Sequence, residues 1–325
     1  MINRRKFIKS SATMAAGTVI APSILAACDR GSSEIDKVGL QLWSIAKTLE
    51  KDFTGGLDLL SQIGYKELEL FGPYPFSTEK DKVTWKNIIP LVGFAQSGYF
   101  GHTAKELKQL LDDRDLTTPS MHIGLDTLRN KMGETAEAAH VLGQQYAGIA
   151  SIPEAERSDL DGYKRMADDF NEIGAKAKAN GIRFMYHNHG YGLQEIDGII
   201  PLNLILERTD PELVFFEMDI FWTIAGGADP VKYLDANPGR YKLMHVKDMT
   251  KRVRFSGDGG NPKQWVELFP YITDAGSGVL DFKTILSHAR KSGVDHFILE
   301  NDAITDPKRS LEDGYKFLST LKLTQ

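Results

Sequence analysis

Residues 182–187 read IRFMYH, an apolar and aromatic run with the length of a buried β-strand. The run follows Gly181, a typical helix stop, which ends an amphipathic helix that we predict over 163–180. A second predicted helix at 199–208 and a second apolar strand, LVFFEM at 213–218, come next. A strand, a helix and a further strand form the repeating unit of α/β folds with a parallel sheet.

The same alternation covers most of the chain. Eight strands are predicted, at 38–43, 66–71, 116–122, 146–150, 182–187, 213–218, 241–246 and 296–300. Helices are predicted before residue 64 and at 105–114, 131–144, 163–180, 199–208, 229–237, 282–292 and 311–321, while 72–100 reads as a Gly/Pro/aromatic-rich insertion. Eight repeats indicate an α/β protein with a closed (β/α)8 TIM barrel. A doubly wound open sheet is the alternative, but its glycine-rich phosphate loops are missing, as is the G-x-S-x-G motif of a hydrolase.

Metal-binding residue types recur where these strands end, and TIM barrels place their active sites there. The residues are His187, Asp219, His245 and Glu300, on four successive strands. Two imidazoles and two carboxylates without sulfur suit one divalent metal ion: Mn²⁺, Co²⁺, Ni²⁺, Zn²⁺, Fe²⁺ or Mg²⁺. Each residue alone has an ordinary structural explanation, since an Asp after a strand is often a helix cap. Their shared position predicts a metal site.

The composition is that of a globular protein. The 325 residues are 42% hydrophobic and 26% charged, with 39 Lys and Arg against 44 Asp and Glu. A formal net charge of −5 argues against a nucleic-acid partner, which would require a basic face. The single Cys excludes a disulfide framework and a cysteine zinc site.

Residues 1–28 read as a twin-arginine-type lipoprotein signal. Arg4-Arg5 precede an uncharged run of small and apolar residues that ends at Leu25-Ala26-Ala27-Cys28, which is similar to a bacterial lipobox. A soluble exported protein cut nearby is the simpler alternative. We expect a polar tether at 29–36 and a single TIM-barrel domain at 37–325. The protein would then be exported, either periplasmic or a lipoprotein that meets the membrane only through its N-terminal lipid anchor.

A set of motifs spans residues 38–302 in a specific order. They are Val38-Gly39-Leu40-Gln41-Leu42-Trp43-Ser44, Tyr186-His187-Asn188-His189, Met218-Asp219-Ile220-Phe221-Trp222, Gly239-Arg240, His245-Val246-Lys247-Asp248, Gly276-Ser277-Gly278-Val279-Leu280-Asp281-Phe282 and Leu299-Glu300-Asn301-Asp302. Together they resemble the sugar phosphate isomerase/epimerase superfamily, the xylose isomerase-like TIM barrels, in its exported bacterial branch. The resemblance implies a divalent metal on the four residues chosen above. Three positions depart from the usual pattern: His187 replaces a Glu, Trp222 replaces a His, and Gly192 replaces an acidic residue.

The resemblance also implies proton abstraction from a carbon next to a carbonyl. Predicted catalytic residues are Glu300, His122 and Lys247, and predicted substrate-binding residues are Glu69, Trp43, Phe71, His189 and Trp222. Each has a structural alternative. Glu69 and Lys247 could form ion pairs, and the aromatic rings could belong to the core.

We therefore expect a metal-dependent isomerase or epimerase that acts on a small carbohydrate. A free sugar or glycoside fits better than a sugar phosphate, because sugar phosphates are scarce outside the cytoplasm. A 3-keto-glycoside lyase working by β-elimination, and a non-catalytic carbohydrate-binding lipoprotein, are the alternatives. A metal-dependent endonuclease would need more ligands and a basic groove. The resemblance is compatible with a homodimer.

Overall fold

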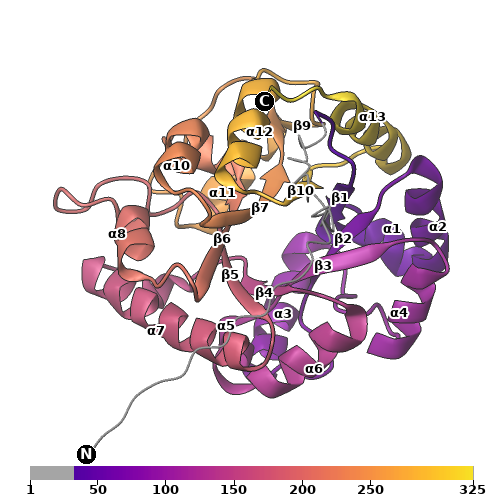
Figure 1. Cartoon of the computed structure of the whole chain (residues 1–325), viewed down its shortest axis with the longest axis horizontal. Helices are drawn as coiled ribbons and strands as arrows, with labels where there is room; N and C mark the ends of the chain where they lie inside the picture. Colours follow the sequence, from indigo (N-terminus) through magenta and orange to yellow (C-terminus); the bar gives the residue numbers. More distant parts are fainter. Residues whose placement is uncertain (1–32, 325) are drawn as a thin grey trace, which may run out of the picture. The chain divides into compact units, whose positions relative to one another are not determined.

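Eight parallel strands close into a barrel in the order β1-β10-β7-β6-β5-β4-β3-β2 (Figure 1). The structure is a computed structural model and describes residues 33–324. The barrel strands are β1 (Val38–Gln41), β2 (Glu67–Phe71), β3 (Thr117–His122), β4 (Tyr146–Ile149), β5 (Arg183–Asn188), β6 (Val214–Asp219), β7 (Tyr241–Val246) and β10 (His296–Leu299). The prediction of a (β/α)8 TIM barrel is confirmed.

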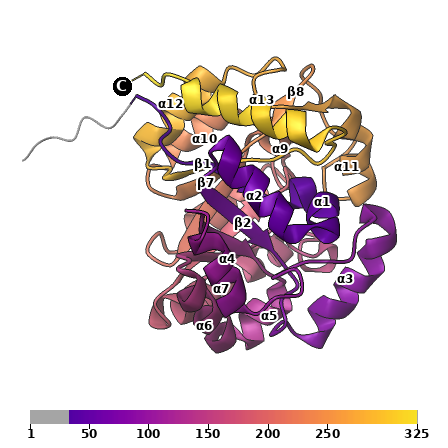
Figure 2. The ribbon, with the colours of Figure 1, turned by 90° about the vertical axis from the view of Figure 1, so that its right-hand side faces the viewer.

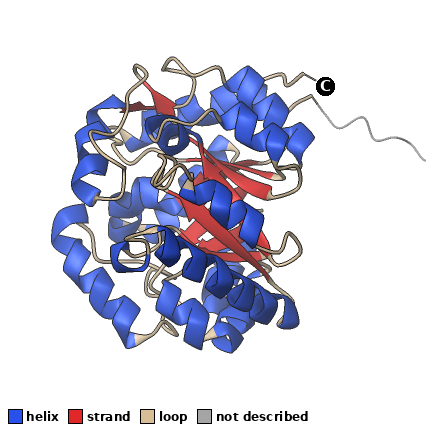
Figure 3. Cartoon of the chain, turned by 90° about the vertical axis from the view of Figure 1, so that its left-hand side faces the viewer, coloured by secondary structure: helices blue, strands red, loops and turns tan. Residues whose placement is uncertain are grey.

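Helices surround the barrel and connect its consecutive strands (Figure 3). They are α1 (Ala46–Lys51), α2 (Phe53–Ile63), α4 (Ala104–Asp112), α6 (Met132–Leu142), α7 (Leu160–Ala179), α8 (Pro201–Arg208), α10 (Pro230–Ala236), α12 (Phe282–Ser292) and α13 (Pro307–Thr320). The last helix, α13, lies beside α2 and β1, so the C-terminal part of the chain packs against its first strand–helix unit (Figure 2).

Several elements were not predicted from the sequence. They are α3 (Glu79–Val92), α5 (Leu125–Asn130), α9 (Ile220–Ala225), α11 (Pro262–Leu268), an antiparallel pair formed by β8 (Asp248–Met249) and β9 (Ile272–Thr273), and 3₁₀ turns at Leu42–Ile45, Glu154–Glu156 and Phe269–Tyr271. The helix α3 lies within the predicted insertion 72–100. Its mostly polar sequence and internal Pro90 hide the usual helical pattern.

An apolar layer inside the barrel supports the residues at the strand ends. It consists of Tyr146, Met185, Leu243 and Ile298. Side chains along a strand alternate between its two faces, so residues two positions apart point the same way. His187 therefore follows Met185 on the inner face of β5, and His245 follows Leu243 on that of β7. The predicted site lies directly above this apolar layer.

Gly148 in β4 is the inward-facing residue next to this layer. A Cβ atom added there would lie 2.2 Å from the backbone oxygen of Met185 on β5, which cannot move without disturbing the strand pair. We expect Gly148→Ala to lower the free energy of unfolding by about 1–3 kcal/mol. Gly133→Ala in α6 is the control, because its added Cβ meets no atom within 4 Å. Urea denaturation of both variants tests this expectation, and equal stability of the two would contradict it.

The described end of the predicted tether packs on the domain. Ile35 is 4% exposed, and the carbonyl of Ser33 accepts a 2.7 Å hydrogen bond from the backbone N–H of Leu323. Residues 33–36 of the predicted tether therefore lie against the barrel domain. The predicted signal at 1–28, including Cys28, lies outside the described residues. Within residues 33–324, no helix has the length and apolar character needed to cross a membrane.

Candidate metal and active site

All four predicted metal ligands lie at the carboxyl ends of barrel strands. His187 is in β5, Asp219 ends β6, His245 is in β7, and Glu300 directly follows β10. The first three are at most 1% exposed. Asp219 and His245 are direct partners in the register of β6 and β7, which brings their side chains together.

Three of these ligands form what we call the mouth group: Asp219, His245 and Glu300. Nδ1 of His245 lies 2.9 Å from Oε2 of Glu300 and 3.9 Å from Oδ2 of Asp219. Asp219 also caps α9, because its Oδ1 accepts a 2.8 Å hydrogen bond from the N–H of Trp222. One oxygen of Asp219 therefore caps the helix, and the other, Oδ2, faces the other residues of the mouth group.

The fourth predicted ligand, His187, belongs to a second cluster. We call it the inner group: His122, His187, Glu217 and His245. Oε2 of Glu217 lies 2.7 Å from Nε2 of His122 and 3.1 Å from Nδ1 of His187. The predicted set of four ligands is thus divided, with His245 shared by both groups. The cause is Glu217, which is the register partner of His187 and draws its imidazole away from Asp219.

Lys247 lies among the carboxylates of the mouth and has no exposed side-chain surface. Its Nζ is 3.1 Å from Asp219 Oδ2, 2.7 Å from Glu300 Oε2 and 2.6 Å from Asp302 Oδ2. Burial alone would lower the pKa of Lys247, but these three carboxylates raise it well above its usual value. The residue is a fixed positive charge at the edge of the mouth group.

Opposite charges also balance in the inner group. Burial opposes ionisation of Glu217, yet His245 and His122 hold the pKa of its carboxyl well below the usual range. Burial likewise disfavours a charged His122, but the carboxylates of Glu69 and Glu217 raise the pKa of its imidazole. Burial and the neighbouring His245 lower the pKa of His187. The inner group therefore combines one carboxyl group of lowered pKa with imidazoles whose pKa values are shifted in opposite directions.

The donor atoms of this region fit a divalent cation. Within the part of the chain that the structure describes, the buried Oδ2 of Asp219 accepts no hydrogen bond, although Lys247 Nζ is nearby, and Nδ1 of His187 and Oε1 of Glu217 are also without one. Buried polar atoms without hydrogen bonds are rare in folded proteins. A cation on Asp219, His245 and Glu300 would satisfy the first of them. Imidazole and carboxylate donors without thiolate match the predicted ion classes and do not select one.

Two residues predicted to bind substrate are packed within the protein. Phe71 is 5% exposed and lies in an aromatic cluster with Trp43, Trp85 and Phe94. Glu69 is completely buried, and its carboxylate binds other protein groups. Phe71 and Glu69 are thus enclosed by other groups of the protein in this structure. Trp43 is partly exposed at the edge of the same cluster.

The other two predicted substrate residues lie next to the mouth. The ring of His189 is 4.8 Å from that of His187 and 6.2 Å from that of Trp222, between ring centroids. Trp265, which was not predicted, stacks on His189 at 5.0 Å. Nε1 of Trp222 is buried and makes no hydrogen bond within the described residues. Trp222 is only 2% exposed and stacks on Phe255, so the partly exposed rings of His189 and Trp265 are the aromatic surfaces available to a sugar.

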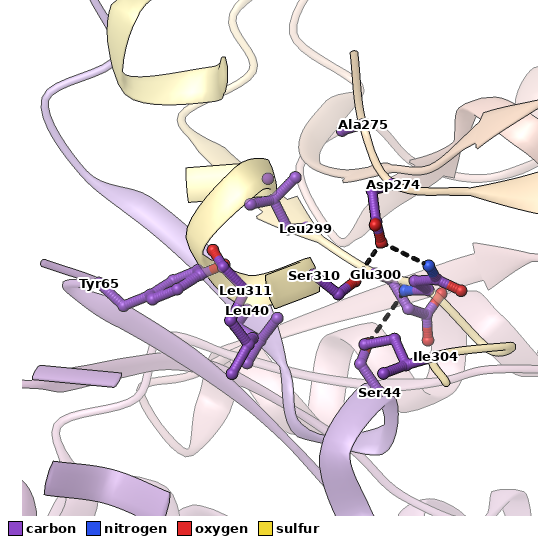
Figure 4. A pocket seen from close by; sticks show the side chains of 12 residues that line it. Leu40, Ser44, Tyr65, Asp274, Ala275, Leu299, Glu300, Ile304, Ser310 and Leu311 are labelled. Atoms are coloured by element: carbon purple, nitrogen blue, oxygen red, sulfur yellow. Dashed lines mark hydrogen bonds between the residues drawn. The ribbon is translucent and has the colours of Figure 1, made fainter. Parts of the chain in front are cut away.

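A small pocket beside Glu300 supports the loop that carries it (Figure 4). Its volume of about 20 Å³ holds about one water molecule, too little for a sugar. On one side, Oδ1 of Asp274 accepts hydrogen bonds from Nδ2 of Asn301 (2.8 Å) and from the hydroxyl of Ser310. On the other, the hydroxyl of Ser44 accepts a 3.0 Å bond from the N–H of Asn301. These bonds fix the backbone immediately after Glu300.

Sequence reasoning missed Glu217, Asp302 and Trp265. Glu217 could have been found, because it lies two residues before Asp219 in a strand and must face the same side. Asp302 lies two residues after Glu300, the same spacing as between Glu217 and Asp219, and this spacing could have suggested it as a partner for Lys247. Nothing in the sequence marks Trp265, which reaches His189 from α11.

The model of one protein family, described as xylose isomerase-like TIM barrel, matches residues 57–321. The chain belongs to this family. Among curated relatives, an inosose dehydratase from Lacticaseibacillus casei is 26% identical over 277 residues, which cover 80% of this chain and 85% of the relative. The predictions of the family and of a sugar-modifying enzyme are confirmed.

Two solved structures show the same fold. A sugar phosphate isomerase/epimerase from Parabacteroides distasonis has a TM-score of 0.69 at 22% identity, and the match covers 94% of this chain and all of that one. The IolI protein, solved with a bound zinc atom, has a TM-score of 0.61 at 13% identity over 89% of this chain and all of that one. At these identities the likeness establishes the barrel.

Proposed function

We propose that this protein is a divalent-metal-dependent lyase that eliminates an alcohol or water β to the carbonyl of a keto-sugar. The observation that carries the proposal is the set of proton-transfer groups at the mouth. Epimerisation requires groups that can move a proton on both faces of one carbon. In the described site, β5 carries His187 where the family resemblance implies a Glu, and His189 directly follows the strand. One base that returns its proton to the leaving group suffices for elimination.

His189 is the side chain best suited to be that base. Its Nδ1 is hydrogen-bonded to the carbonyl oxygen of Ala150, which directs Nε2 away from the backbone. Burial, together with nearby His187 and Lys247, lowers the pKa of His189 well below its usual value. A neutral imidazole with Nδ1–H carries its lone pair on Nε2, as a general base requires.

The other predicted catalytic residues are less suited to remove a proton. Burial would raise the pKa of Glu300, but Lys247 and His245 hold it well below the usual range, so its carboxylate is a weak base. His122 is bonded through Nε2 to Glu217 and favours its charged form. We assign Glu300 to metal binding, and Lys247 and His122 to the positive charge around the site.

The reaction balances with the groups present. Nε2 of His189 takes the proton from the carbon next to the carbonyl, and the electrons of that C–H bond form the enolate. The carbonyl of the enolate then re-forms, a double bond forms between the α and β carbons, and the β C–O bond breaks. His189 gives its proton to the departing oxygen. A divalent ion on Asp219, His245 and Glu300 would polarise the carbonyl and stabilise the enolate. The products are an unsaturated ketone and an alcohol or water.

The relatives support the lyase over the isomerase. A dehydratase removes water by elimination, and the curated relative described above carries that name. We further propose that the substrate is a non-phosphorylated keto-sugar or glycoside, bound against the partly exposed ring of Trp265. Export as a lipoprotein, proposed from residues outside the described range, agrees with a substrate without phosphate.

A single assay distinguishes the two reactions. The Mn²⁺-treated protein is incubated in D₂O with a 3-keto-glycoside that carries a chromogenic aglycone. We expect release of the aglycone together with absorbance from the unsaturated ketone. Deuterium incorporation with inversion or ketone migration, and no released aglycone, would instead identify an isomerase or epimerase. A chelator-treated sample is the control, and it should be inactive.

A further inference from the structure

Glu69 is a buried carboxylate directly behind the mouth group. It lies in β2 and has no exposed surface. Its Oε2 accepts hydrogen bonds from Nε2 of Gln41 at 2.7 Å and Nε2 of His245 at 2.6 Å, and its Oε1 accepts one from the hydroxyl of Ser120 at 2.6 Å. Both carboxylate oxygens therefore accept hydrogen bonds from protein groups, and neither is exposed to a substrate.

Gln41 and Ser120 fix the orientation of this carboxylate independently of its contact with His245. Oε1 of Gln41 accepts a 3.1 Å hydrogen bond from the backbone N–H of Trp43, so the amide nitrogen of Gln41 must face Glu69. Gln41, Glu69 and Ser120 come from three adjacent strands, β1, β2 and β3. The carboxylate is thus held by the barrel itself and does not depend on a loop.

The contact determines which nitrogen of His245 faces the mouth. Nε2 faces Glu69, and the ring then places Nδ1 toward Asp219 and within 2.9 Å of Glu300 Oε2, a hydrogen-bond distance. When a cation of the mouth group takes the place of the proton on Nδ1, the remaining proton of His245 is on Nε2 and faces Glu69. Carboxylates that accept from the second nitrogen of a metal-binding histidine fix its tautomer and strengthen it as a ligand.

We propose that Glu69 is a positioning residue that holds His245 in the Nε2–H form and so strengthens cation binding by the mouth group. The inference rests on the proposed metal site and goes beyond it by assigning a role to a residue without substrate contact. It also accounts for a carboxyl side chain without exposed surface, which is unfavourable unless its oxygens have hydrogen-bond partners.

The same strand contains a matched control. Glu67 is 4% exposed and lies two residues earlier, toward the opposite end of the barrel, where its Oε2 lies 2.8 Å from Nδ1 of His296. Glu67→Gln therefore removes a buried carboxylate of a carboxylate–histidine pair without touching either group of the site. Glu69→Gln keeps the size of the side chain, and the Ser120 hydroxyl can accept from the new amide.

The test is titration of each purified, metal-stripped protein with Mn²⁺ and with Zn²⁺, with circular dichroism as the check of folding. We expect affinity in Glu69→Gln to fall by about 10–100-fold and in Glu67→Gln to stay within about twofold of the parent. Nitrogen-15 NMR of the Zn²⁺-loaded parent should show His245 protonated at Nε2. If Glu69→Gln does not fold, the test is repeated with Gln41→Leu, which removes the hydrogen bond from Gln41 to Glu69. A loss of metal affinity in this variant supports the proposal, and affinity equal to that of the parent overturns it.

Two failures can be told apart. A parent that binds neither ion would overturn the metal site and this inference with it. A parent that binds, with a folded Glu69→Gln variant of equal affinity, would overturn the role of Glu69 alone.

Discussion

Replacing Asp219 with Asn is expected to abolish tight binding of a divalent ion and, with it, the activity. The change removes the charge of Oδ2, the buried oxygen that accepts no hydrogen bond, but preserves the shape of the side chain. Asn is as good a helix cap as Asp, so the bond from Asp219 Oδ1 to the N–H of Trp222 can be retained and α9 should stay folded. Since loss of a residue that only supports a metal ligand already costs about 10–100-fold in affinity, we expect a loss of at least about 100-fold.

The measurement is metal content by mass spectrometry after equilibration with Mn²⁺ and gel filtration. Asp229→Asn is the matched control, because Asp229 caps α10 through the N–H of Val231 on the exposed surface. The control should retain the metal content of the parent. Retention of metal in Asp219→Asn as well would contradict the assignment of the mouth group.

Replacing His189 with Gln is expected to lower kcat by about 10²–10⁴-fold, the usual contribution of a general base. The substitution removes the lone pair of Nε2 and leaves an amide that can still donate to the carbonyl of Ala150. Metal affinity should stay close to that of the parent, because His189 belongs to neither the mouth group nor the inner group. Loss of catalysis with retained metal would separate the base from the ligands.

Steady-state kinetics on the chromogenic 3-keto-glycoside, with Mn²⁺ titration alongside, gives both quantities. His140→Gln on the exposed side of α6 serves as the control and should behave as the parent does. An unchanged kcat in His189→Gln would exclude this residue as the base. A fall in metal affinity equal to the fall in kcat would instead indicate that His189 supports the metal.

The barrel was predictable from sequence because its strands are short, apolar and separated by helices with clear stops. Residues 241–246 were predicted with the observed bounds, and 182–187 differ by one residue at each end. The helix at Pro262–Leu268 and the short pair of β8 and β9 carry no comparable signal, since neither is long enough for a hydrophobic period to appear.

The position of the site could be predicted from the sequence, but the contacts between its side chains could not. Strand ends identified His187, Asp219, His245 and Glu300, but which of them share a cation depends on partners from neighbouring strands. His187 turns to Glu217 because β5 and β6 align these two residues, and no single strand contains that information. Glu69 was expected at the substrate for the same reason, although its partners on β1, β3 and β7 place it behind the site.

A carbohydrate-binding protein without activity is disfavoured by the polar layer behind the mouth. Binding a sugar does not require Glu217 and Glu69 to be buried beside three imidazoles, an arrangement that is stable only when every charge has a partner. Orienting the histidines that we propose to bind metal and transfer protons would explain why these carboxyl groups are buried there.

The central claim is that the mouth group holds one divalent ion. Anomalous diffraction from a crystal of the parent protein equilibrated with Mn²⁺ tests it most directly. We expect one strong peak bounded by Asp219 Oδ2, His245 Nδ1 and Glu300 Oε2. A crystal without a peak there, or with its peak among His122, His187 and Glu217, would contradict it.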